Sequence, residues 1–131
     1  MADLKFVGKN NQKKKYSVFA SDAVATSATQ DDILFTLPAA ALVTAIYGIV
    51  LTASGVVNST LDVKVGSTVV ANEIPVAALG TVQGVSFVPT YFATGGSVTV
   101  VAGAVAPNTL GRVKIVVEYI ETELANGDYT L

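Results

Sequence analysis

The chain has 131 residues, of which 51% are hydrophobic and only 14% are charged, with a formal net charge of −2 and neither cysteine nor histidine. Without cysteine it has no disulfides, thiolate nucleophiles or thiolate metal sites, and without histidine it lacks the commonest general base near neutral pH and the commonest transition-metal ligand. The length suits a single domain, and because ordinary soluble domains carry about 25% charged residues, the low charge predicts association with other protein surfaces.

The N-terminal segment carries most of the basic side chains. Its lysines, against the single acid Asp3, are Lys5, Lys9, Lys13, Lys14 and Lys15. No continuous apolar run follows this basic start, which argues against a secretory signal and favours synthesis in the cytosol. We expect a basic arm over residues 1–15 and a sandwich domain over 16–131 that ends in a short acidic tail. The lysines could contact nucleic acid, but the sequence pI of about 4.9 favours docking on an acidic protein surface.

Most of the remaining chain is rich in Val, Ile, Thr, Phe and Tyr, which suit a pleated, half-buried surface. Turn-forming pairs such as Ser54-Gly55 and Gly66-Ser67 separate these segments at the spacing of a sandwich or barrel. The predicted strands are 16–20, 33–37, 43–52, 60–65, 82–88, 97–102 and 112–120, with shorter ones around 5–7, 24–26 and 68–71. A single helical turn is expected at 75–79, with Pro75 in its first turn and Gly80 as its cap.

Two of these segments predict how the strands are covered. In 112–119, alternation places Val113, Ile115, Val117 and Tyr119 on a core face and Arg112, Lys114, Val116 and Glu118 on a partly solvated face. In 43–52, alternation sets Val43, Ala45, Tyr47, Ile49 and Leu51 against Thr44, Ile46, Gly48, Val50 and Thr52. Neither face of this second strand is charged, so we expect it to be covered on both sides, by a second sheet and by a subunit or partner.

The sequence contains no amphipathic segment long enough for the crossover helices of a parallel sheet. The prediction is therefore an all-β, single-domain antiparallel β-sandwich of seven to nine strands. The most apolar stretch, 42–53, is interrupted by Thr44, Gly48 and Thr52, so we predict no membrane span.

Catalytic motifs are missing as well. The serines have no histidine base and no G-x-S-x-G elbow, and a Ser–Lys pair cannot be picked out from the sequence. Asp31 with Asp32, or Glu118 with Glu121, could form a carboxylate pair, but loop and surface positions are the simpler interpretation. No phosphate loop, dinucleotide fingerprint or calcium loop occurs. We expect no enzyme activity, cofactor, metal or small-molecule substrate.

The C-terminal segment is acidic, opposite in sign to the N-terminal arm. Between residues 116 and 131 it carries Glu118, Glu121, Glu123 and Asp128 and no base. The two ends could meet across a subunit interface, face partners of opposite charge, or simply be solvated. The candidate interface residues are Lys9, Lys13, Lys14, Lys15, Tyr16, Glu118, Glu121, Glu123 and Asp128.

A series of segments between residues 31 and 120 carries a family resemblance. They are ILFTLPA from residue 33, VLTA from 50, LDVKVG from 61, SVTV from 97 and RVKIVVEYI from 112. In this order they resemble the capsid decoration, or cement, proteins of tailed bacteriophages. The resemblance implies a jelly-roll-like sandwich that binds the major capsid protein lattice on the outer surface of the virion as a homo-oligomer, commonly a trimer. It implies no catalytic residues.

Two other functions fit the same sequence. A head-fibre base, tail or baseplate subunit would use a similar sandwich and trimer with a different partner. A carbohydrate-binding module would need exposed aromatic platforms, for which the candidates are Tyr47, Tyr91, Phe92 and Tyr119. Aromatic residues in such apolar surroundings are more often part of a core.

Overall fold

The computed structural model describes residues 15–83 and 86–123. These residues form eleven β-strands and no helix. The strands are β1 (Lys15–Ala20), β2 (Val24–Ala25), β3 (Asp31–Leu37), β4 (Ala41–Thr52), β5 (Thr60–Val65), β6 (Thr68–Pro75), β7 (Gly80–Gln83), β8 (Ser86–Phe87), β9 (Thr90–Phe92), β10 (Gly96–Ala102) and β11 (Arg112–Glu121).

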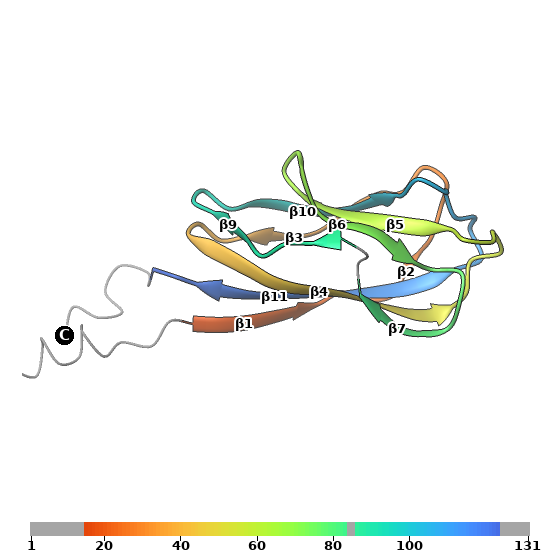
Figure 1. Cartoon of the computed structure of the whole chain (residues 1–131), viewed down its shortest axis with the longest axis horizontal. Helices are drawn as coiled ribbons and strands as arrows, with labels where there is room; N and C mark the ends of the chain where they lie inside the picture. The colour runs from red at the N-terminus through yellow and green to blue at the C-terminus, as the bar shows by residue number, and fades with distance from the viewer. Residues whose placement is uncertain (1–14, 84–85, 124–131) are drawn as a thin grey trace, which may run out of the picture.

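The strands form two antiparallel sheets packed face to face (Figure 1). Sheet A has the order β1-β11-β4-β7, with β2 also paired to β11 and β9 to β4; sheet B has the order β3-β10-β5-β6-β8. The chain changes sheet at nearly every connection, which is how two Greek keys make a jelly roll. Strands β2, β8 and β9 have only two or three residues each. The other eight strands agree with the predicted number of seven to nine strands. The predicted all-β antiparallel sandwich is confirmed.

The core lies between the sheets and consists mainly of valine. Val113, Ile115 and Val117 of β11 are fully buried, as the alternation predicted, and face Val98 and Val100 of β10 in the same cluster. Near the end of β1, stacked aromatic rings extend this core: Phe19 lies on Phe35, with ring centroids 4.0 Å apart, and Phe35 lies on Tyr119.

A glycine in β4 sets how closely the two sheets approach. A Cβ atom added at Gly48 would lie 2.7 Å from Cγ2 of Ile74, which belongs to the facing sheet. Because such a distance is shorter than any ordinary carbon–carbon contact, a larger residue would force the sheets apart.

The predicted faces of β4 were wrong where its pairing with β11 is irregular, and one such place lies near the start of the strand. Val43 does not share a face with Tyr47 and Ile49; it is buried in the core together with Ile46. The cause is a β-bulge. Glu118 of β11 pairs with Ala45 and the next residue, Tyr119, pairs with Val43, so the intervening Thr44 of β4 has no partner in the register. An extra residue moves every preceding side chain to the other face of the strand.

Two other predicted elements differ from the structure. The segment 75–79 contains no helical turn: Pro75 ends β6, and Val76 is buried with its N–H donating to the Ser59 carbonyl and its carbonyl accepting from the Ser54 N–H. These bonds to a neighbouring loop replace helical ones. The predicted strand 82–88 is divided, because β7 belongs to sheet A and β8 to sheet B.

The remaining differences concern strand ends. Asp31 and Asp32 are the first residues of β3 and not the end of a loop, and β6 continues to Pro75. Strand β9 was not predicted. The expected short strand around 5–7 lies outside the described residues, and β1 begins one residue before its predicted start.

Candidate interaction surface

The side of sheet A that faces away from the core combines apolar and aromatic side chains with the charged residues Arg112, Lys114 and Glu118 of β11. Since Val113, Ile115 and Val117 point into the core, alternation points Val116 and Ile120 outward. Tyr47 and Ile49 of β4 lie beside them on the same side, with Tyr47 opposite Val116 and Ile49 opposite Lys114. We call this side the sheet A outer face.

The edges of the sheet A outer face are more exposed than its centre. On β1, Tyr16 and Val18 are each 56% exposed, and on β9, Tyr91 is 51% exposed. Strand register places Tyr16 opposite Ile120, Ile120 opposite Leu42, and Leu42 opposite Tyr91, so one apolar row crosses four strands. Cross-strand rows of this kind form continuous surfaces.

The opposite side of the molecule has a different character. The outward residues of sheet B include Asp62, Lys64 and Thr99, and Thr99 lies opposite Lys64 in the register. Exposed apolar residues also occur there, such as Ile33 on β3 and Val69 on β6, but charged and hydroxyl side chains lie between them. The sheet A outer face differs in that its large apolar residues form a continuous row across four strands, which suits a protein partner.

Two of the predicted interface residues meet on the sheet A outer face. The hydroxyl of Tyr16 on β1 donates a hydrogen bond to Oε1 of Glu118 on β11. This bond raises the pKa of Tyr16 above its ordinary value, aided by desolvation and by the negative charge of Glu118 and proximity to Tyr47, while Thr44 opposes the shift. Strands β1 and β11 are therefore joined within one molecule, side by side in the same sheet.

A titration tests this contact. Because the pKa of Tyr16 is higher in the fold than in the unfolded chain, the bond stabilises the fold below about pH 10 and is lost as pH rises through the folded-state value. The part of the phenolate absorbance that Tyr16→Phe removes belongs to Tyr16. We expect this part to develop above pH 10 in the wild type and at a lower pH in Glu118→Gln. Measuring absorbance near 295 nm against pH gives both curves, and an unchanged curve in Glu118→Gln would contradict the contact.

The other predicted interface residues are placed as follows. Lys15 and Glu121 are cross-strand partners in the β1–β11 register, so the basic and acidic segments begin next to each other. Glu123 is exposed just after β11. The rest lie outside the described residues: Lys9, Lys13, Lys14 and Asp128.

Sequence reasoning missed several residues of the sheet A outer face. Val18 and Leu42 were not proposed, and Tyr91 was named only as a candidate sugar platform, although the uncharged faces of 43–52 had indicated that this strand is covered on its outer side. Tyr91 could be found only from the pairing of β9 with β4, which joins residues distant in the sequence. No local signal in the sequence marks such a pairing.

The structure separates one of the two candidate carboxylate pairs. Glu118 and Glu121 are three residues apart on one strand, so alternation directs them to opposite faces of the sheet. Among the described residues, no group of three or more acidic, histidine or cysteine side chains could hold a metal ion. The same residues include no helix with the length and hydropathy needed to span a membrane.

The overall fold has counterparts among solved structures, although no protein-family model and no curated protein sequence matches the chain. A chain in the acidic stable capsid structure of Helicobacter pylori bacteriophage KHP30 superposes with a TM-score of 0.57 at 13% identity, covering 86% of this chain and 97% of that chain. A chain of the capsid asymmetric unit of cyanophage Pam1 superposes with a TM-score of 0.53 at 18% identity, covering 82% and 83% respectively. At these identities the likeness is one of fold.

Proposed function

We propose that this protein is a non-catalytic structural component of a bacteriophage virion that decorates and stabilises the capsid from outside. It binds the lattice of the major capsid protein as a homo-oligomer, with a trimer favoured. After synthesis in the host cytoplasm it resides on the outer capsid surface. The observation that carries the proposal is the sheet A outer face, on which the large apolar residues Tyr16, Val18 and Tyr91 are each more than half exposed.

The fold likeness supports the viral setting of this surface. Chains with a similar fold occur in two phage capsid structures, and in one of them the match extends over 97% of the neighbouring chain. A chain of similar architecture, matched over nearly its whole length, therefore occurs in a capsid structure. Repeated copies on a symmetric lattice allow many weak contacts to act together, so no single strong site is needed.

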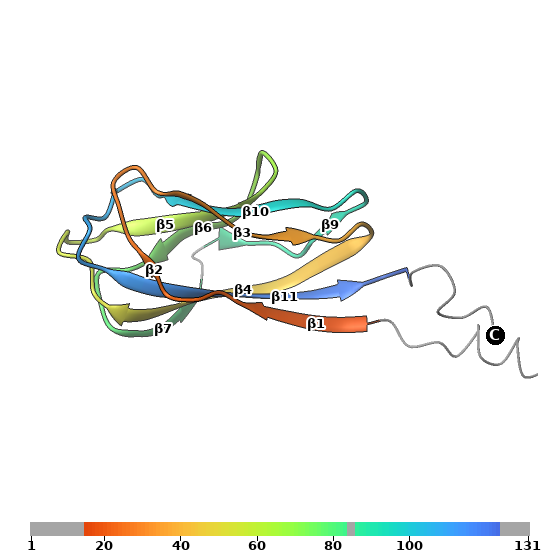
Figure 2. The same cartoon turned by 180° about the vertical axis from the view of Figure 1, so that it is seen from behind.

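The arrangement of the chain ends agrees with docking by the sheet A outer face. Both the start of β1 and the end of β11 lie at one end of this sheet (Figure 2). We propose that the basic segment before β1 and the acidic segment after β11 contact the shell next to this face. Such charged contacts would orient the apolar face during the encounter with the lattice.

Two substitutions on the sheet A outer face test the proposal. Val18→Lys and Tyr91→Lys place charges on exposed positions of the apolar face, and Val18 lies opposite Glu118, so its lysine gains an oppositely charged neighbour. We expect the double variant to lose at least about tenfold in affinity for the capsid, because a lysine buried at the contact must be desolvated. The measurement is co-sedimentation with empty capsids of the phage whose genome carries the gene.

The matched control is Ile33→Lys on sheet B, which places the same charge on an exposed apolar position of the opposite face. We expect this variant to bind as the wild type does. An equal loss in Ile33→Lys would show that the docking face is wrong. If the wild type binds tails or baseplates and ignores empty capsids, the alternative of a head-fibre base, tail or baseplate subunit is correct.

The carbohydrate-binding alternative has little support in the geometry. Tyr119 stacks on Phe35, and Phe92 packs against the core, so neither offers a free ring face to a sugar. Tyr47 and Tyr91 remain on the sheet A outer face. Binding on a glycan array that Tyr91→Lys abolishes would revive this function.

A further inference from the structure

Four loops gather at the end of the sandwich opposite the start of β1 and the end of β11 (Figures 1 and 2). They span residues 26–30, 53–59, 76–79 and 103–111, and we call them the loop tip. None of these loops contains Asp, Glu, Lys or Arg. Loops that face water normally carry charged or strongly polar residues, so an uncharged tip is a candidate contact surface.

Large aliphatic side chains project from the loop tip. Val57 is 79% exposed, Leu79 69% and Leu110 64%, and Val105 is also exposed. They come from three different loops that hydrogen bonds hold together. The tip therefore presents several apolar side chains to solvent at one end of the molecule.

Hydrogen bonds to Asn108 hold the loops in place. Its side-chain oxygen Oδ1 accepts from the Gly55 N–H at 2.9 Å and from the Leu110 N–H at 3.1 Å. Its backbone N–H donates to Oγ of Ser54, and its carbonyl accepts from the hydroxyl of Thr26. One asparagine thus ties three loops together. These loops are already ordered, so they lose little conformational entropy when they contact a partner.

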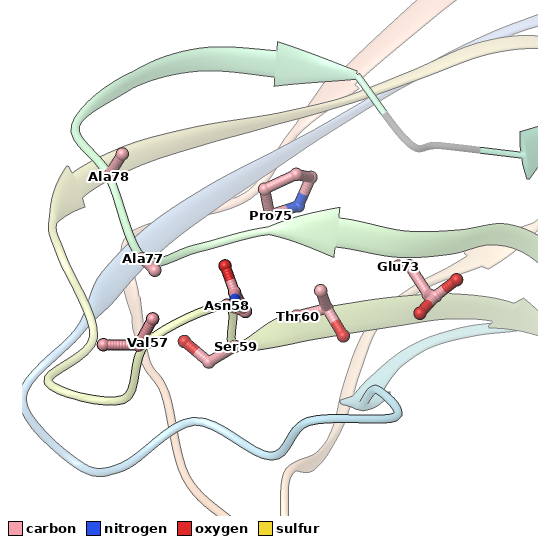
Figure 3. Close-up of a pocket in the computed structure, with 8 residues that line it drawn as sticks. All are labelled: Val57, Asn58, Ser59, Thr60, Glu73, Pro75, Ala77 and Ala78. Carbon is pink, nitrogen blue, oxygen red and sulfur yellow. The ribbon is translucent and has the colours of Figure 1, made fainter.

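A hollow of about 560 Å³ is lined in part by Val57, one of these exposed side chains (Figure 3). Its walls include Val57, Thr60, Pro75, Ala77 and Ala78, and Leu79 follows the last of these in the chain. Glu73 is the one charged residue that lines it. Asn58 and Ser59 also line the hollow, and its apolar part, formed by valine, proline and alanine side chains, suits an aliphatic side chain.

We propose that the loop tip is the surface through which copies of this chain associate, with Leu79 of one copy seated in the hollow of another. A protruding side chain next to a hollow on the same surface is what a contact between identical copies requires. The absence of charge in the four loops also matters, because contact between identical surfaces would bring like charges together. This inference deepens the homo-oligomer part of the proposed function.

The alternatives fit the loop tip less well. The sheet A outer face carries Glu118 near its middle, so stacking two such faces would bring two carboxylates close together. A lipid surface is disfavoured because the four loops contain no Trp, Tyr, Lys or Arg, the residues that anchor proteins at a membrane interface. A second copy is therefore the occupant we assign.

Sedimentation velocity of purified full-length chain tests this inference. We expect the wild type to be oligomeric at micromolar concentration and Leu79→Asp to be monomeric at concentrations at least tenfold higher. The control is Val69→Asp, which places the same charge on sheet B opposite Lys64 and should leave the oligomer intact. A monomeric wild type, or an oligomer that Leu79→Asp leaves unchanged, would overturn the inference.

Cysteine cross-linking gives an independent result, because the chain contains no cysteine and one introduced thiol is unique. We expect Leu79→Cys to form covalent dimers with a short bismaleimide and Val69→Cys to form few. Equal yields would contradict a contact at the loop tip. Capsid co-sedimentation separates the two proposals. Leu79→Asp should still bind capsids, but more weakly than the wild type. If neither the wild type nor any variant binds capsids, the proposed function is wrong, and the contact at the loop tip is judged by sedimentation velocity and cross-linking.

Discussion

Alanine in place of Gly95 is expected to lower the free energy of unfolding by about 2–5 kcal/mol. Gly95 has a φ of 71°, a left-handed conformation that disfavours any residue with a Cβ atom. The added Cβ would also lie 2.1 Å from the Leu37 carbonyl oxygen and 2.8 Å from the backbone of Pro38. Because both neighbours are backbone atoms, the chain must shift to accommodate the methyl group.

Gly66→Ala is the matched control for this substitution. Gly66 has a φ of 59°, similar to that of Gly95, but a Cβ atom added there would have no neighbouring atom within 4 Å. We expect it to cost only the conformational term, about 1–2 kcal/mol. Urea denaturation at a fixed protein concentration, followed by circular dichroism, measures both. Equal losses in the two variants would show that the packing of Gly95 against Leu37 and Pro38 is wrong.

Alanine in place of Ile115 is expected to cost about 2–5 kcal/mol, because it leaves a cavity between the two sheets. Ile115 is fully buried in the centre of β11, and its backbone N–H and carbonyl are both bonded to Ser21. Those backbone bonds survive the substitution, so the loss reports on the side chain. The same denaturation experiment measures the effect.

The next residue on the same strand supplies the control. Val116 points to the sheet A outer face and is partly exposed, so Val116→Ala should cost about 1 kcal/mol or less. A larger loss at Val116 than at Ile115 would mean that the sides of β11 have been exchanged. The comparison thus tests the division between core and interaction surface on which both proposals depend.

Strand β11 illustrates what a local pattern can determine. The alternation from Arg112 to Tyr119 identified the buried side chains correctly, because a strand without an irregularity keeps a strict period of two. The same rule failed in β4, where Thr44 is an extra residue. A bulge depends on how two strands pair, and the sequence of one strand does not record it.

The candidate surfaces show the same division. The low charge and the uncharged segment 43–52 are enough to predict association, and the charge pattern of the chain ends identifies Tyr16 and Glu118 as interface candidates. The fold joins these two by a hydrogen bond and adds Val18, Leu42 and Tyr91 to the same face. The loop tip was not foreseen, because its loops are separated by long stretches of chain and meet only in the fold.

By itself, then, the sequence determined the kind of fold and predicted association with partners: β-branched and aromatic residues with alternating burial favour sheets, and too few charges leave apolar surface exposed. Only the tertiary structure decided which apolar residues lie outside and which of them are neighbours. Burial and adjacency in an antiparallel sandwich arise from pairing between strands far apart in the chain, and such pairing is set by the packing of the whole molecule.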